Sequence, residues 1–385
     1  MRIKYIELFA GIGGFRLGFE SACAELGVKA KCVFASEIDK YARQTYKANW
    51  KDEPAGDFGL VDYRHIPKHT VCLASTSCQP FSSAGKRKQG ADTRNTIPYL
   101  LNYLAAAMPD ILIHENVQSL YNSAEYETMN KVLFKLGYTV FDKVYNAVSV
   151  TPQNRKRLFT VAFKDFKTGF GFSWPELPEL GLKMKDILEP SVSEKYTLKD
   201  KTWKCLQRRV GEYYKKNGGW KSYLKMIDPC GTGGTLTASY GTNGGAAILI
   251  PPDLRKTVFK NGFGYGIAEP DGTGRTLTAR YKKDGGEILI EQKNKNPRIM
   301  TPRECARYMG FPDDFKIVVS DSQAYKQFGN AVVPGVVECI AGSVLKKMEF
   351  KNTRPNKKSR KKIEYNPLFD ASLNTMRNNF LYSMG

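Results

Sequence analysis

The stretch Tyr5-Ile-Glu-Leu-Phe9-Ala-Gly-Ile-Gly-Gly14 joins a short apolar run to a turn that is rich in glycine. Residues 15–22 then space their apolar side chains as a helix does, so the stretch predicts a strand, a tight turn and a helix. Glycines let a backbone approach a ligand closely, and the free N–H groups at a helix start attract an anionic group. Because many glycine turns are only turns, this one alone leaves ligand binding open.

Strands and helices continue to alternate along the first part of the chain. Strands are predicted at 31–36, 71–74, 110–114, 137–148 and 158–163, and helices at 99–107 and 123–136. This alternation predicts an α/β fold with a doubly wound, mostly parallel sheet.

From about Gly169 the composition shifts toward Gly, Pro, Lys and Tyr, which predicts a smaller β-rich or irregular domain. We therefore expect a first domain at 1–170, a second at 171–297, a return segment at 298–348 that completes the first, and a basic tail at 349–385. In the return segment, 297–315 reads as a short helical connection with a capping box at Thr301 and Glu304, and 332–348 as an apolar helix.

The composition points to a polyanionic partner. Lys and Arg outnumber Asp and Glu by 59 to 38 in 385 residues, a formal net charge of +21. Such an excess favours nucleic-acid binding, although a basic surface can also serve solubility. The eight cysteines form no Cys-x-x-Cys pair and there are three histidines, so we expect no metal site and a reduced, cytoplasmic setting. No apolar stretch approaches the ~18 residues of a membrane helix, so no membrane association is expected.

Cys78 follows the strand at 71–74 and is the candidate nucleophile. It precedes a loop that contains Ser83, Lys86 and Arg87, and an electropositive, partly exposed setting favours the thiolate form of a cysteine. The alternative is that Cys78 is a small buried apolar residue, as many lone cysteines are.

Acidic residues end other strands. Glu37 follows the second strand, where an acid commonly binds ribose hydroxyls, but it could equally cap the next helix. Asp57 with Phe58 could bind and stack on an adenine ring, or Gly56-Asp57 could be an ordinary turn. Glu115 ends the strand at 110–114, on the same edge of the predicted sheet as Cys78.

Arg155 and Arg157 precede or begin the strand at 158–163. Alternation along an extended chain places both arginines on one side, so both could face a single site. A phosphate clamp or a structural ion pair would explain the same two residues.

These motifs, taken in order, resemble the DNA (cytosine-5) methyltransferases of bacteria and phages. The shared segments are Phe9-Ala-Gly-Ile-Gly-Gly, Glu37, Gly56-Asp57, Ser77-Cys78-Gln79-Pro80-Phe81-Ser82, Glu115-Asn116-Val117, Gln153-x-Arg155-x-Arg157, Pro302 to Asp313 and Gln323 to Asn330. The resemblance covers 1–165 and 297–345. It implies a Rossmann-like fold, the cofactor S-adenosylmethionine, and a target-recognition domain in the middle of the chain.

The resemblance also implies the site residues. Cys78 would attack C6 of a cytosine flipped out of duplex DNA, Glu115 would act at N3, Arg157 at O2, and Arg155 would orient Glu115 or a phosphate. For the cofactor it implies a set at the turn and strand ends: Phe9, Gly11, Gly13, Glu37, Asp57, Phe58 and Asn330. The loop at 81–96 would close over the base and contact DNA through Ser83, Lys86 and Arg87.

One departure from the family concerns the residue before the nucleophile. The family usually has proline there, and this chain has Ser77, which frees φ and adds an N–H. We expect an active enzyme. The rival interpretations are a catalytically impaired DNA-binding protein and an RNA cytosine methyltransferase.

The middle of the chain contains an approximate repeat. The segment from Cys230 to Tyr240 resembles the one from Asp271 to Tyr281, and each contains Thr-Leu-Thr-Ala. Its Thr, Arg280 and Tyr281 could contact DNA bases, or the copies could be structural hairpins. We further expect a monomer that acts on double-stranded DNA, with a cognate restriction endonuclease that is not held in a stable complex.

Overall fold

The computed structural model describes residues 2–77, 95–204, 247–249, 274–277, 279, 288–292 and 294–348. Within these ranges the chain forms two compact units. The first runs to Asn146 and resumes at Lys156–Leu177 and from Ala331, and the second holds Ala147–Arg155 and Pro178–Asn330. The first unit is therefore assembled from three separate parts of the sequence. The predicted domain boundaries at 170, 297 and 348 remain predictions.

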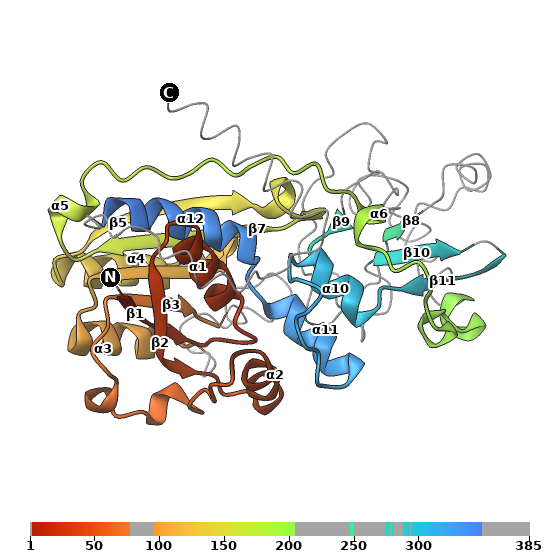
Figure 1. Ribbon diagram of the computed structural model, residues 1–385, viewed down its shortest axis with the longest axis horizontal. Coiled ribbons are helices and arrows are strands. Elements are labelled where there is room, and N and C mark those ends of the chain that lie inside the picture. The colour runs from red at the N-terminus through yellow and green to blue at the C-terminus, as the bar shows by residue number, and fades with distance from the viewer. Residues whose placement is uncertain are drawn as a thin grey trace. The chain divides into compact units, whose positions relative to one another are not determined.

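The first unit is built on a six-stranded sheet with the strand order β2-β1-β3-β4-β7-β5 (Figure 1). The strands are β1 (Arg2–Leu8), β2 (Lys29–Ser36), β3 (Val71–Ser75), β4 (Ile111–Val117), β5 (Thr139–Asn146) and β7 (Lys156–Phe163). Strands β2, β1, β3 and β4 pair in parallel, and β7 runs antiparallel to both β4 and β5. The predicted mostly parallel α/β sheet is confirmed.

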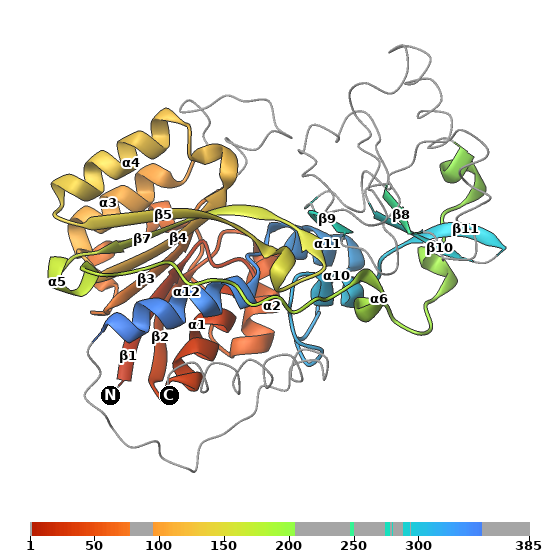
Figure 2. The same ribbon diagram turned by 90° about the horizontal axis from the view of Figure 1, so that it is seen from above.

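Helices cover both faces of this sheet, as Figure 2 shows for α3 and α4 on one side and α1 and α12 on the other. The helices of this unit are α1 (Gly14–Glu25), α2 (Lys40–Trp50), α3 (Ile97–Ala107), α4 (Ala124–Lys135), α5 (Phe166–Gly169) and α12 (Pro334–Lys347), with short 3-10 turns at Phe58–Leu60, Tyr63–His65 and Gln118–Leu120. Side chains alternate between the two faces of a strand. Accordingly Ile6, Leu8, Cys72 and Ala74 join the core under α3 and α4.

The second unit contains two small sheets in its described residues. One has the order β11-β10-β8, and the other pairs β6 with β9. Its elements are a 3-10 turn at Ala147–Ser149, β6 (Gln153–Asn154), α6 (Met184–Ile187), a 3-10 turn at Glu194–Tyr196, β8 (Ala247–Leu249), β9 (Gly274–Arg275), β10 (Ile288–Gln292), β11 (Lys295–Ile299), α10 (Pro302–Tyr308) and α11 (Asp321–Asn330).

Two sequence predictions for the return segment need correction. The helical connection was expected from residue 297, but residues up to Ile299 belong to β11, because they pair with β10. The apolar helix expected from 332 begins at Pro334, a residue that favours the first helical turn. The capping box is confirmed: the Thr301 hydroxyl accepts from Glu304 N, and the Glu304 carboxylate accepts from Thr301 N.

One stretch, Asp321–Lys347, passes a test of length and composition for a membrane-spanning helix. It consists of α11 and α12, and 72% of its apolar window is buried inside the protein. Core helices pass the same test, so the stretch is weak evidence for a membrane segment.

Candidate active site

Glu115 is held at the end of β4 by contacts to both of its carboxylate oxygens. Ser75 pairs with Glu115 across β3 and β4, and the Ser75 hydroxyl donates to Glu115 Oε2 at 2.5 Å. The Arg157 Nε lies 3.3 Å from Glu115 Oε1, because antiparallel β7 brings Arg157 opposite Val117. The Glu115 residue is only 6% exposed. A nearly buried carboxylate thus has a fixed orientation, and Arg157 compensates its charge.

A second polar cluster lies beside Glu115, at the end of the same two strands. The Asn116 Nδ2 donates to both Thr76 O (2.9 Å) and Thr76 Oγ1 (2.8 Å), and His114 Nε2 lies 2.7 Å from Thr76 Oγ1. All three residues are buried. Burial lowers the pKa of His114 to about 4, so its imidazole is neutral at pH 7. The neutral ring adds no charge beside Glu115.

Several predicted site residues lie outside the described part of the chain. They are Cys78, Ser83, Lys86, Arg87, Arg280 and Tyr281. The described chain ends at Ser77 on one side of this gap and resumes at Asn95 on the other. The nearest described residue before Cys78 is Ser77, two residues after the end of β3.

The glycine turn after β1 concentrates unusual backbone conformations. Phe9, Gly11 and Gly13 have φ of 56°, 55° and 86°. A left-handed φ is rare for a residue with a side chain, so Phe9 marks a strained position of the kind found at ligand sites. At Gly13 a Cβ would lie 2.2 Å from Trp50 Nε1, whereas at Gly11 it would meet nothing within 4 Å. The turn is thus packed on one side and open at Gly11.

A buried carboxyl supports the turn from below. Glu7 on β1 is 1% exposed, and it accepts hydrogen bonds from Arg16 N (3.2 Å) and from the Tyr46 hydroxyl (2.9 Å). Burial raises the pKa of Glu7 to about 8. Sequence reasoning did not single out Glu7, and the signal that could have found it is an acid inside an apolar strand.

Glu37 connects the glycine turn to the start of α2. Its Oε2 accepts from Gly11 N (2.8 Å) and its Oε1 accepts from Asp39 N (2.8 Å). The N-cap of α2 is Asp39, whose side chain accepts from Tyr41 N and Ala42 N. Helix capping was one of the two interpretations of Glu37. The residue that caps α2 is Asp39.

The Asp57 carboxylate is exposed and accepts from Gly59 N at 2.9 Å. The two interpretations of Gly56-Asp57, a turn and an exposed acidic group, are therefore compatible. Phe58 differs from the expectation of a ring available for stacking. It is 3% exposed, and its ring packs on Tyr63, Tyr103 and Phe9. Aromatic packing in the core explains this position, because a ring gains more from burial than from solvent exposure.

Ile38 is a residue of this region that sequence reasoning missed. It directly follows Glu37 and is 68% exposed. The available signal was an apolar residue between two acids in a predicted loop.

Arg155 lies in the second unit, where it fixes the backbone. Its guanidinium donates to Leu277 O (2.9 Å) and Gly329 O (3.1 Å), and Arg155 is buried. Arg157 lies in β7 and belongs to the first unit. The extended chain is interrupted at Arg155, which separates β6 from β7. The side chain of Arg157 contacts Glu115, and the orienting role expected of Arg155 stays a prediction.

The second copy of the sequence repeat, at 271–281, is hydrogen-bonded to Gln153 and Asn154, which belong to the same Gln153-x-Arg155 motif. Leu277 N donates to Gln153 Oε1 (2.8 Å), and the Thr276 hydroxyl donates to Asn154 O (2.6 Å). These two residues of the copy thus contact the backbone and side chain of β6, and both interpretations of the repeat, base contacts and structural hairpins, stay predictions. The first copy, 230–240, lies outside the described residues. Asn330 is exposed at the end of α11, directly after the Gly329 carbonyl that Arg155 binds.

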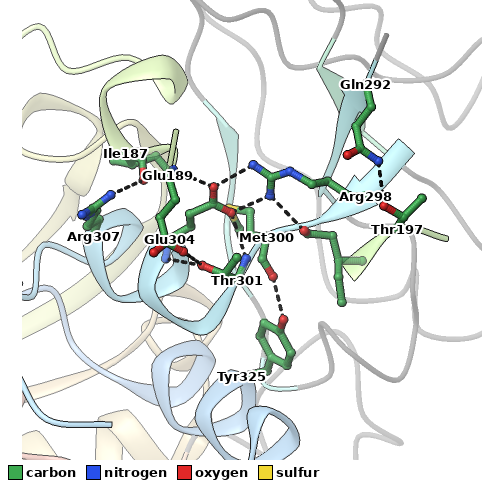
Figure 3. Close-up of polar contacts among 11 residues, drawn as sticks. Ile187, Glu189, Thr197, Gln292, Arg298, Met300, Thr301, Glu304, Arg307 and Tyr325 are labelled. Carbon is green, nitrogen blue, oxygen red and sulfur yellow. Dashed lines mark hydrogen bonds and ion pairs between the residues drawn. The ribbon is translucent and has the colours of Figure 1, made fainter. Parts of the chain in front are cut away.

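A buried ion pair organises the rest of the second unit (Figure 3). Arg298 donates to both Glu304 oxygens, at 2.7 Å each, and Glu304 also accepts from Glu189 N at 2.9 Å. The Tyr325 hydroxyl donates to Met300 O at 2.6 Å. Strand β11 and helices α10 and α11 are therefore tied into one body, which carries Asn330.

Several of the predicted cofactor residues lie in the first unit. Gly11 lies in an open turn with left-handed backbone, Glu37 and exposed Ile38 follow β2, and Asp57 caps the 3-10 turn at Phe58–Leu60. A solved structure entitled Entamoeba histolytica methyltransferase EhMeth has the same fold, with a TM-score of 0.65 and 18% identity, and the match covers 91% of this chain and 100% of that one. The two chains therefore share a fold, that of the S-adenosylmethionine-dependent methyltransferases.

The sequence assigns the family within this class. Residues 3–346 match the family of C-5 cytosine-specific DNA methylases. The chain is 41% identical to the Type II methyltransferase M.NlaX of Neisseria lactamica (88% of this chain, 95% of the relative) and 36% identical to M.DsaV of Dactylococcopsis salina (89% and 86%). The chain belongs to the C-5 cytosine-specific DNA methylase family and transfers a methyl group from S-adenosylmethionine to C5 of cytosine in DNA.

Proposed function

We propose that the chain methylates a specific site in duplex DNA through a covalent bond between Cys78 and C6 of a flipped-out cytosine. The observation that carries this proposal is the fixed orientation of the Glu115 carboxylate, which Ser75 and Arg157 contact. In the sequence, Ser75 stands three residues before Cys78. Glu115 lies at the carboxyl end of β4, beside the end of β3, and α/β folds carry their sites at such strand ends.

The covalent step would make C5 reactive. The Cys78 thiolate forms a bond to C6, and the electron pair of the C5–C6 double bond moves to C5. S-adenosylmethionine supplies the methyl group. C5 then loses its proton to a base, the C5–C6 double bond re-forms, and Cys78 leaves as thiolate. Because the reacting atoms are stacked inside a duplex, the base must first be flipped out, at a cost of about a few kcal/mol.

Glu115 and Arg157 would stabilise charge on the ring, and Arg155 would act indirectly. Glu115 would contact N3 and Arg157 would contact the O2 oxygen, where negative charge develops as Cys78 adds. The pairing of Arg157 with Glu115 at 3.3 Å supports a shared site for these two residues. For Arg155 we propose a positioning role, since its guanidinium fixes the carbonyl next to Asn330.

The cofactor would lie along the glycine turn. Phe9, Gly11 and Gly13 would border its amino-acid part, and Glu37 would accept from its ribose hydroxyls. Asp57 would accept from the adenine amine, and exposed Ile38 would cover the adenine face. Phe58 supports this pocket through its ring contact with Phe9, at 5.6 Å between centroids. By the family resemblance, Asn330 is a further candidate for cofactor binding.

The partners proposed for this activity follow from the relatives. We propose that the enzyme acts as a monomer in the cytoplasm, and that a cognate restriction endonuclease cleaves the same site without a stable complex. The relatives M.NlaX and M.DsaV are Type II methyltransferases, which supports the second part. For the middle segment, 171–297, we propose target recognition.

A trapping experiment tests the covalent mechanism. The purified chain is incubated with S-adenosylmethionine and with duplex DNA in which 5-fluorocytosine replaces cytosine. Fluorine at C5 cannot leave as a proton does, so the adduct should persist in denaturing gels for the natural chain and be absent for Cys78→Ala. Glu115→Gln should slow trapping by at least about 100-fold, since an electrostatic contact of this kind contributes about 3 kcal/mol.

The same preparation separates the rival functions. Methyl transfer to duplex DNA and to tRNA is compared, and bisulfite sequencing of DNA from cells that express the chain locates the modified cytosine. A chain that binds cofactor and DNA but neither methylates nor traps DNA would be the catalytically impaired DNA-binding protein. Preferential transfer to tRNA would favour the RNA enzyme.

A further inference from the structure

The peptide group between Thr76 and Ser77 is hydrogen-bonded at both ends. Its carbonyl oxygen accepts from Asn116 Nδ2 at 2.9 Å, and its N–H, that of Ser77, donates to Thr96 Oγ1 at 2.8 Å. The Asn116 amide is itself oriented, because its oxygen accepts from Val117 N at 2.7 Å. A peptide group is planar, so two bonds on opposite edges fix its plane. The next residue in the chain is Cys78.

The Thr96 hydroxyl makes this contact and does not cap its own helix. Thr96 is the N-cap residue of α3, and a threonine there commonly accepts from the N–H groups of the first helical turn. Its side chain makes no capping bond, and Pro98 at the second helical position has no N–H. Asn95 Oδ1 accepts from Ile97 N at 3.1 Å instead. The N–H of the first helical residue thus has an acceptor without the hydroxyl.

These contacts bear on the departure from the family at Ser77. A proline in this position would fix φ through its ring and would bring no N–H. Serine leaves φ free and adds a donor, and in this chain that donor has a specific acceptor. We propose that Thr96 is a positioning residue for methyl transfer, which restrains Ser77 through its N–H and so replaces the restraint of a proline ring before Cys78. The inference rests on the proposed role of Cys78.

The geometry predicts that the two restraints exclude each other. In proline the Cδ atom takes the place of the amide hydrogen, so it would point at a hydroxyl whose oxygen is only 2.8 Å from the nitrogen. Ser77→Pro should therefore fit only when the side chain at position 96 is shortened. The expected pattern is one of compensation, in which each single change is harmful and the pair is better than either.

The test measures single-turnover methyl transfer to duplex DNA, the Kd of S-adenosylmethionine and the melting temperature for a set of variants. Thr96→Val and Thr96→Ala should each slow transfer about tenfold, the effect of about 1.4 kcal/mol in a barrier. Both should leave the cofactor Kd within about twofold, because the glycine turn is untouched. Thr96→Ser keeps the acceptor and should retain most of the rate. Thr128→Val, which removes an exposed hydroxyl bond on α4, is the matched control.

The decisive comparison adds Ser77→Pro to natural Thr96 and to Thr96→Ala. Ser77→Pro alone should slow transfer, and the double variant should be faster than Thr96→Ala. The proposal is overturned if the double variant is no faster, if Thr96→Ser is as slow as Thr96→Val, or if the melting temperature and cofactor affinity fall together with the rate. Cys78→Ala is measured alongside: if it retained methyl transfer, the proposed nucleophile would be wrong, whatever the Thr96 variants do.

Discussion

At the scale of single residues, the polar contacts at the strand ends join residue pairs that no local sequence pattern reveals. The contact between Ser75 and Glu115 arises because β3 and β4 pair in the register that places them opposite each other. The resemblance to a family could indicate Glu115 and Arg157 as site residues, since it compares motifs in order. It could not indicate Ser75 or Thr96, because their roles depend on which strand and which helix lie beside them.

Arg155 shows the same limit in another form. Alternation along a strand predicted a side shared with Arg157, but alternation holds only while the strand is continuous. The chain leaves the strand at Arg155, and the acceptors of its guanidinium are carbonyls of Leu277 and Gly329, far along the sequence. Such partners depend on tertiary folding alone.

His114 should make the stability of the enzyme depend on pH. Burial lowers its pKa from about 6.5 in an unfolded chain to about 4, so below pH 6.5 the unfolded state binds a proton that the folded state does not. The free energy of unfolding should therefore fall as the pH drops from 6.5 toward 4. The contribution of this group should reach about 2 kcal/mol at pH 5.

Chemical denaturation at pH 7 and pH 5 checks this prediction. His114→Gln removes the titrating group, so its midpoint should change less between the two pH values than that of the natural chain. The exposed His65→Gln serves as the control. An equal change for His114→Gln and the natural chain would show that other groups account for the acid sensitivity.

At the scale of elements, the sequence indicated most strands and helices of the first unit, because long apolar runs and helical spacing survive any packing arrangement. It could not give the strand order, in which β7 lies antiparallel between β4 and β5. Helix α11 was also missed, since the polar residues of 321–330 dilute its apolar face. Strand β11 depends on its pairing with β10 and has little apolar pattern of its own.

The contact between α1 and α12 offers a prediction at this scale. A Cβ on Gly18 would lie 2.3 Å from Pro334 O and 2.7 Å from Val337 Cβ, so the two helices approach closely at this point. Gly18→Ala should separate them and destabilise the first unit by about 1–3 kcal/mol, as overpacking does. Thermal denaturation with and without S-adenosylmethionine measures the loss.

Gly342→Ala provides the matched control for this substitution. Gly342 lies within α12, and a Cβ there would meet nothing within 4 Å. Alanine has the higher helix propensity, so this variant should be as stable as the natural chain or more stable by about 0.5–1 kcal/mol. If both variants behaved alike, the close approach at Gly18 would carry no energetic weight.

At the scale of the whole molecule, the net charge of +21 is consistent with an enzyme that acts on DNA. Composition could indicate the polyanion, but not which basic residues contact it, because charge count carries no position. The candidate contacts at Lys86, Arg87 and Arg280 lie outside the described residues, as does the basic tail. The sequence alone assigns the tail a role in DNA binding or in solubility.

Charge substitution in the tail decides between these two roles. Residues 351–362 contain seven Lys and Arg, and their replacement by Gln keeps the chain length. If the tail binds phosphates, DNA affinity should weaken, and the slope of log Kd against log salt concentration should decrease by about 0.9 for each phosphate that the variant no longer neutralises. The rate at saturating DNA and the modified site should not change, because binding to phosphates carries no sequence information directly.

The control replaces Arg2, Lys4, Lys29 and Lys31 by Gln, which are exposed on β1 and β2 at the ends opposite the glycine turn. A slope that changes equally per charge in both variants would reduce the tail to a general electrostatic effect, whereas an unchanged slope in the tail variant would assign its charge to solubility.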